Sequence, residues 1–214
     1  MDMRDRNLEK IENILFFHRP KPINVEDYFS VFVPLMKIEG EICVVYELRA
    51  MSLRRQPGEI SFPGGKMEKG ESPRYAAIRE LCEELLIPSD KVQVFGETDY
   101  LITRGTSQIY SFAGLIKDIE FEDIRPNADE VEKLFYVPLR WFMENEPKKY
   151  TMDVELIQSE DFPFELIPNG KDYKFYKGVD EILFYEYEDY VIWGFTAKIT
   201  DRLIRILKEN NFNF

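Results

Sequence analysis

The sequence is poor in cysteine and histidine, and it lacks long apolar runs. Its 214 residues include two cysteines, Cys43 and Cys82, and one histidine, His18. Two cysteines do not make a disulfide framework, so we interpret both as buried thiols and expect a reducing, cytoplasmic setting. No run of eighteen apolar residues is present and the first six residues are mostly charged, so neither a transmembrane helix nor a signal peptide is expected.

Basic residues are also scarce relative to acidic ones. The chain carries 28 Lys and Arg against 40 Asp and Glu, which gives a net charge of −12. This balance argues against non-specific binding to nucleic acid or to an anionic membrane. A small anionic substrate stays possible, but binding it requires clustered Arg and Lys side chains or bound cations.

Apolar and aromatic residues, in contrast, are plentiful. The hydrophobic content is 44%, with 17 Phe and 12 Tyr, which is typical of a globular protein with a real core. Apolar residues at helical spacing over residues 4–16 predict a helix, and the prolines that follow predict a linker. We therefore expect residues 1–25 to form an N-terminal helix and linker, and residues 26–214 to form a single domain.

The remaining patterns alternate between strand and helix. Val, Ile, Phe and Tyr dominate several short runs, and two amphipathic segments show helical spacing. Expected strands cover 28–38, 41–48, 59–62, 91–100, 108–116, 131–137, 150–156, 175–176 and 182–187, and expected helices cover 73–86, 139–144 and 199–207. This order predicts a mixed α/β sandwich rather than a regular βαβ array.

The expected helix over residues 73–86 carries the most informative residues. Ser72 and Pro73 suit a helix start and Pro88 marks its end, while one face of the helix is apolar. Glu80, Glu83 and Glu84 stand at spacings that make them neighbours, so their charges repel. Arg79 offsets part of this repulsion, and a divalent cation would turn it into attraction.

A candidate site that offers carboxylate oxygens and no histidine favours Mg²⁺ or Mn²⁺ over Zn²⁺. The alternative is an ordinary solvated acidic face. Gly64 and Gly65 lie just upstream, where a backbone without Cβ can approach a phosphate or a metal ion closely. Glu71 lies between this loop and the helix and can brace the loop.

These residues resemble the Nudix box, G-x5-E-x7-R-E-U-x-E-E-x-G-U, where U is a bulky aliphatic residue. Gly65, Glu71 and the run Arg79-Glu80-Leu81-Cys82-Glu83-Glu84-Leu85-Leu86-Ile87 match every specified position except the last glycine, which is Leu86. The upstream segment 53–65 is similar to the extra motif of coenzyme A pyrophosphatases of this superfamily, and 190–197 is similar to a segment of the same subfamily. The resemblance covers about residues 28–205.

The resemblance implies a Nudix α/β/α sandwich with a mixed sheet, plus extra C-terminal strands and a terminal helix. It implies that Glu80, Glu83 and Glu84 bind Mg²⁺ or Mn²⁺, with the Gly64 carbonyl as a further ligand. The bound ions would neutralise a diphosphate and activate water. Arg79 would orient the carboxylates. The base would be a carboxylate, with Glu83, Glu84 and Glu130 as candidates, although Glu130 could equally be a solvated loop charge.

The subfamily's reaction splits coenzyme A into adenosine 3′,5′-bisphosphate and 4′-phosphopantetheine. We predict that Arg54 or Arg55 contacts substrate phosphate, with Arg49 and Lys66 nearby, while a solvated loop arginine is the alternative for either. A Nudix hydrolase for ADP-ribose or NADH, or a non-catalytic nucleotide-sensing domain, stays open. The aromatic-rich run 162–187 could form a homodimer surface, cover the substrate or belong to the core.

Leu86 is the one departure within the box. The family's glycine supplies a left-handed residue at a helix end, and leucine in that conformation costs roughly 1–2 kcal/mol. We therefore expect a remodelled helix end at which Pro88 terminates the helix.

Overall fold

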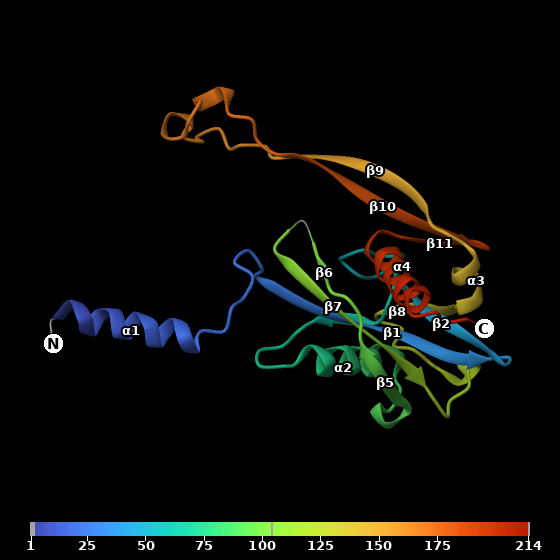
Figure 1. The fold of residues 1–214 in the computed structure, drawn as a ribbon. Helices are drawn as coiled ribbons and strands as arrows, with labels where there is room; N and C mark the ends of the chain where they lie inside the picture. The colour runs from blue at the N-terminus through green and yellow to red at the C-terminus, as the bar shows by residue number, and fades with distance from the viewer. Residues whose placement is uncertain (1–2, 104, 214) are drawn as a thin grey trace.

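The protein is described here by a computed structural model that covers residues 3–103 and 105–213. Four α-helices and eleven strands are connected mostly by short loops (Figure 1). The helices are α1 (Met3–Phe17), α2 (Pro73–Leu85), α3 (Leu139–Glu144) and α4 (Gly194–Glu209). The strands are β1 (Asp27–Ile38), β2 (Glu41–Arg49), β3 (Ile60–Ser61), β4 (Gly64–Lys66), β5 (Val92–Glu97), β6 (Leu101–Ile102), β7 (Ser107–Ile116), β8 (Val131–Pro138), β9 (Lys148–Glu155), β10 (Lys177–Tyr187) and β11 (Tyr190–Trp193).

A mixed sheet of eight strands forms the centre of the fold. The strand order is β3-β2-β1-β7-β5, with β4 paired to β1, β6 to β7 and β8 to β2. β1 and β7 run parallel, and the other pairs in this sheet are antiparallel. A second, antiparallel sheet has the order β11-β10-β9. The expected α/β fold with a mixed sheet, extra C-terminal strands and a terminal helix is therefore confirmed.

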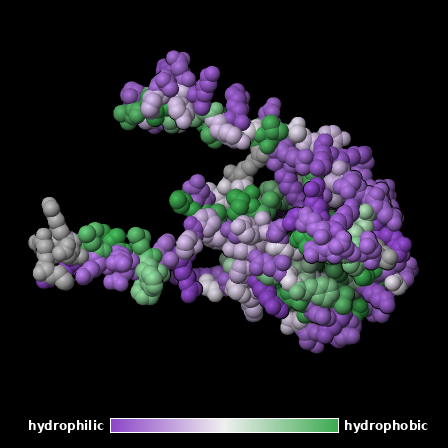
Figure 2. Space-filling model, viewed as in Figure 1, coloured by the Kyte–Doolittle hydropathy of each residue, from purple (hydrophilic) through white to green (hydrophobic). Residues whose placement is uncertain are grey.

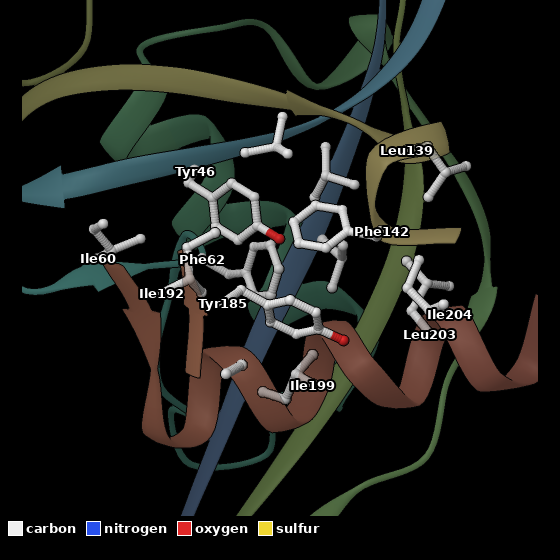
Figure 3. Packing of buried hydrophobic residues seen from close by; sticks show 14 of the residues in the cluster. Tyr46, Ile60, Phe62, Leu139, Phe142, Tyr185, Ile192, Ile199, Leu203 and Ile204 are labelled. Atoms are coloured by element: carbon white, nitrogen blue, oxygen red, sulfur yellow. The ribbon is translucent and has the colours of Figure 1, made fainter. Parts of the chain in front are cut away.

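Two apolar cores cover the two faces of the central sheet. Along β1, Phe32 and Met36 point to the α2 side, while Val33 and Leu35 point to the α4 side, as the two-residue period of a strand requires. On the α4 side, Tyr46 stacks on Phe62 (Figure 3). The Tyr46 hydroxyl also forms a hydrogen bond of 2.9 Å with the Thr200 hydroxyl of α4. This packing fixes α4 and the second sheet over one face of the central sheet.

Two segments extend away from this body. α1 projects from it, and Figure 2 shows apolar residues on its surface. Most apolar side chains of α1 are exposed, for example Leu8 and Phe17. The predicted division at residue 25 stays a prediction. No helix among residues 3–103 and 105–213 combines the length and the apolar character that crossing a membrane requires.

The long β9–β10 hairpin forms the second projection. The expected strand at Phe175 and Tyr176 is wrong, because both residues lie in irregular backbone before β10 begins. Phe175 instead packs edge-on against Phe162 and Tyr173 at the hairpin tip. An apolar doublet that looks like a strand therefore belongs to a small aromatic cluster.

Candidate active site

α2 begins and packs as its local sequence predicts. The Ser72 hydroxyl accepts a hydrogen bond from the Tyr75 amide at 3.3 Å, and Pro73 occupies the first turn. Ala77, Leu81 and Leu85 are fully buried against the sheet. The neighbouring side of the helix carries its arginine and glutamates, so α2 presents charged groups beside the loop that precedes it.

The end of α2 differs from the expectation. Leu86 adopts the left-handed conformation, with φ 51° and ψ 41°, and its side chain is exposed. The helix end is therefore not remodelled, and leucine occupies the conformation that glycine usually provides. The structure accepts a strain of about 1–2 kcal/mol at this position. The glutamates of the box keep their place on the preceding turn.

The loop before α2 lies directly against the box glutamates. Gly64 and Gly65 belong to β4, which pairs antiparallel with β1. The Gly64 amide donates a hydrogen bond to Oε2 of Glu84 at 2.9 Å. A Cβ atom on Gly65 would lie only 2.3 Å from Oε1 of Glu80. A side chain at residue 65 would therefore displace the Glu80 carboxylate, which occupies that space.

Arg79 holds three carboxylates around one guanidinium group. Its Nε donates to Glu71 at 2.9 Å, and its Nη1 contacts Glu80 at 2.8 Å and Glu83 at 3.0 Å. Glu71 also accepts a hydrogen bond from the Glu68 amide. The guanidinium lowers the pKa of Glu71, since it hydrogen-bonds the charged carboxylate. The geometry thus links the loop to the helix and fixes the direction of Glu80 and Glu83.

Glu84 is almost fully buried, with 3% of its surface exposed. Burial raises the pKa of its carboxyl, and the charge of Glu47 raises it further. Glu80 and Glu130 act in the same direction, so these four carboxylates lie close enough to repel one another. Burying several like charges together is unfavourable unless a cation or protons compensate them.

Sequence reasoning missed Glu47. It lies in β2 within the run Cys43-Val-Val-Tyr-Glu-Leu48, and it is completely buried. A charged residue inside such an apolar strand is the signal that could have revealed it, because glutamate is almost never fully buried without a partner.

Glu130 lies at the edge of the same cluster. The loop that holds it is fixed at both ends: the Asn127 amide donates to the Glu84 carbonyl at 2.8 Å, and the Ala50 amide donates to the Glu130 carbonyl at 2.8 Å. The side chain is half-buried. Burial has the largest effect in raising the pKa of Glu80, and the charges of Glu83 and Glu130 also raise it. The structure thus brings Glu130 to the box, although it is far from the box in the sequence.

The donor set suits a hard divalent cation. Glu47, Glu80, Glu84 and Glu130 offer only oxygen atoms, as Mg²⁺ and Mn²⁺ prefer. Oε2 of Glu47 is buried without any hydrogen-bond partner. Within the described ranges no three acidic, histidine or cysteine side chains already enclose an ion-sized space. The residues fit a cation by chemistry and charge, and their side chains would have to move to close around it.

An adjacent cleft of about 540 Å³ begins at Gly64 and Gly65. Arg49 and Arg55 line it, together with Phe195 at the start of α4. Of the other predicted phosphate contacts, Arg54 is exposed and absent from the cleft lining. Lys66 instead forms an ion pair with Asp27 at 2.6 Å. The structure therefore brings two of the four predicted cations together beside the box.

Another hollow, between α4 and β10, also contains cations. Its Lys149, Lys198, Arg202 and Arg205 side chains each contact a carboxylate. These pairs leave less positive charge for an anionic ligand than the cleft beside the box, where the contact of the Arg49 guanidinium with Glu47 is long, at 3.8 Å.

The family model described as the NUDIX domain matches residues 29–158, more than half of the chain. The Nudix hydrolase NudL of Photorhabdus laumondii is 31% identical over 86% of this chain and 88% of its own length. The peroxisomal coenzyme A diphosphatase of Mus musculus is 28% identical over 86% of this chain and 71% of its own length.

Nudix hydrolase 3 of Caenorhabditis elegans is 29% identical over 64% of this chain, and the match spans 60% of that protein's length. Among solved structures, a MutT/nudix family protein from Enterococcus faecalis aligns with a TM-score of 0.50 and 11% identity. The alignment covers 94% of this chain and 68% of that chain. At this identity the likeness concerns the fold alone.

Proposed function

This chain belongs to the Nudix family, and from that premise we propose that it hydrolyses the diphosphate bond of coenzyme A or its derivatives. The products would be adenosine 3′,5′-bisphosphate and 4′-phosphopantetheine or its acyl form. The observation that carries the proposal is the junction of the box carboxylates with an arginine-lined cleft at Gly64 and Gly65. The named activity of the mouse relative and the similarity of segment 53–65 to the coenzyme A pyrophosphatase motif support this choice of substrate.

Glu80, Glu83, Glu84 and the Gly64 carbonyl would hold Mg²⁺ or Mn²⁺. A bound cation would neutralise the diphosphate and make a bound water more acidic. Arg79 orients Glu80 and Glu83, and Glu71 keeps Arg79 in place. The Gly64 amide fixes one oxygen of Glu84. These contacts restrict the box carboxylates, which would limit the reorganisation that binding a cation requires.

A carboxylate must accept the proton of the attacking water, because the only histidine, His18, follows α1 outside the site. Glu83 is held by Arg79, and Glu84 accepts the Gly64 amide. Glu130 accepts one long side-chain hydrogen bond within the described part of the chain, from the Asn127 side-chain amide at 3.4 Å. We therefore assign the base role to Glu130. Arg49 and Arg55 would contact the phosphates, as charge-assisted hydrogen bonds favour.

A substrate panel tests the proposal. The protein is incubated with Mg²⁺ or Mn²⁺ and, separately, with coenzyme A, an acyl-coenzyme A, ADP-ribose and NADH, and the products are identified by mass spectrometry. The expected result is cleavage of the coenzyme A compounds to 3′,5′-bisphosphorylated adenosine. Cleavage of ADP-ribose or NADH in their place would support a different Nudix substrate. No cleavage of any compound would support a nucleotide-sensing domain.

A further inference from the structure

We propose that Glu47 of β2 supplies a carboxylate oxygen to the divalent-cation site, as a ligand from outside the Nudix box. The inference rests on the proposed function, because it adds a residue to the same site. Nothing in the box pattern specifies this position, which lies 18 residues before Gly65 in the sequence.

The two oxygens of Glu47 have different surroundings. Oε1 accepts a hydrogen bond from the Ser61 hydroxyl at 2.7 Å. Oε2 has no hydrogen-bond partner, although the side chain is completely buried. An unpaired oxygen on a buried carboxylate is costly, since it has lost its water and gained nothing in return. The hydroxyl of Ser61 therefore orients the carboxylate and leaves one oxygen for a ligand.

That carboxylate belongs to the acidic cluster of the site. Two residues after Glu47, Arg49 of β2 pairs with Val131, the neighbour of Glu130. Ser61, which hydrogen-bonds Glu47, lies three residues before Gly64, whose amide donates to Glu84. Carboxylates from β2, from α2 and from the loop 127–130 thus converge from three separate segments. Such an arrangement of oxygen donors suits a hard cation. It would be unfavourable in a protein core that binds no cation.

The alternative is that Glu47 is simply the structural partner of Arg49. The distance between Nη1 of Arg49 and Oε1 of Glu47 is 3.8 Å, which is beyond hydrogen-bond range. The Nε atom of Arg49 is itself buried without a hydrogen-bond partner. The contact also involves the oxygen that Ser61 already uses. This pair therefore does not account for the unpaired Oε2 atom of Glu47.

The test measures Mn²⁺ binding by isothermal titration calorimetry in the absence of substrate. The near-isosteric substitution Glu47→Gln keeps an oxygen for Ser61 and removes the charge. Glu41→Gln is the matched control, because Glu41 is exposed on the same strand. We expect Glu47→Gln to weaken Mn²⁺ binding about 10-fold or more, the loss typical of groups around a metal site, and Glu41→Gln to leave it unchanged.

Thermal unfolding in EDTA distinguishes a ligand from a structural ion-pair partner. With the metal removed, Glu47→Gln should raise Tm, because it removes a buried charge from a repulsive cluster. The added stabilisation by Mn²⁺ should at the same time be smaller than in the wild type. A lower Tm in EDTA with unchanged Mn²⁺ affinity would overturn the inference and assign Glu47 to Arg49.

A second variant guards against a fold defect in the first. Ser61→Ala keeps the carboxylate but removes the hydroxyl that orients it, so a smaller loss of Mn²⁺ affinity is expected. Equal affinity in wild type, Glu47→Gln and Ser61→Ala would overturn the inference while the proposed hydrolysis stands. If the wild type binds Mn²⁺ more tightly than Glu47→Gln but cleaves no coenzyme A compound, the proposed function fails and the inference stands.

Discussion

The substitution Gly65→Ala should lower the catalytic activity of the protein but change its stability little. The added Cβ would lie 2.3 Å from Oε1 of Glu80, whereas ordinary contact begins at 3.4 Å. The carboxylate must therefore move by about 1.1 Å (3.4 − 2.3). A misplacement of about 1 Å at a reacting centre costs on the order of 100-fold in rate. The expected result is a fall of about 100-fold in kcat/KM for the coenzyme A substrate.

Stability should change little, for two structural reasons. Gly65 has no positive φ angle, so alanine fits its backbone. The obstructing atoms belong to the end of a flexible side chain, and an off-rotamer glutamate costs only about 0.5–1.5 kcal/mol.

Gly96→Ala is the matched control, since a Cβ at Gly96 meets nothing within 4 Å and its φ is not positive. Steady-state kinetics and urea denaturation of the two variants and the wild type provide the comparison. Wild-type kinetics in a folded Gly65→Ala protein would refute the reasoning, because Glu80 would then tolerate displacement.

Three further outcomes are expected. Leu81→Ala should lower the free energy of unfolding by about 2–5 kcal/mol in urea denaturation, because Leu81 is completely buried; a loss below 1 kcal/mol would contradict the packing of α2. Glu71→Gln should lower Tm most at neutral pH, and its Tm should converge with that of the wild type in acid. Arg79 lowers the pKa of Glu71, so the ion pair stabilises the fold above the ordinary carboxyl pKa and this stability is lost as the pH falls through the lowered pKa. A Tm difference that grows towards acid pH would contradict this prediction. Arg55→Ala should reduce kcat/KM by about 10- to 100-fold, from about 1.5–3 kcal/mol of charged hydrogen bonding, while Arg54→Ala stays near wild type; equal effects in both variants would contradict the cleft assignment.

Local signals made the box helix predictable. The Ser72 cap, the initial proline and the apolar spacing of Leu81 and Leu85 all act within a few residues of the chain. The contact between Arg79 and Glu83 also follows from helix geometry alone, because residues four apart are neighbours. The structure of such a segment depends mainly on interactions between residues close in the sequence, so the sequence pattern predicts it.

Contacts across the sheet could not be predicted in the same way. Glu47 meets Ser61 because β2 pairs with β3 in that register, and the register depends on the whole sheet. Lys66 pairs with Asp27, near the point where β4 pairs with β1, and it does not line the cleft. These contacts depend on tertiary structure, which a one-dimensional pattern does not contain.

Leu86 shows a different limit. The cost of a left-handed leucine predicts a helix end that changes to avoid it. The structure keeps the left-handed conformation. A strain of about 1–2 kcal/mol at one residue is small beside the burial of the apolar face of α2, where each large side chain contributes about 1.5–3 kcal/mol.

The most direct test of the central claim is hydrolysis of coenzyme A with Mg²⁺ by the wild type and by Glu83→Gln and Glu84→Gln, with folding checked by circular dichroism. Metal-dependent cleavage by box carboxylates predicts that the wild type yields adenosine 3′,5′-bisphosphate and that the folded variants lose most of this activity. Near-wild-type hydrolysis by both variants would contradict the account.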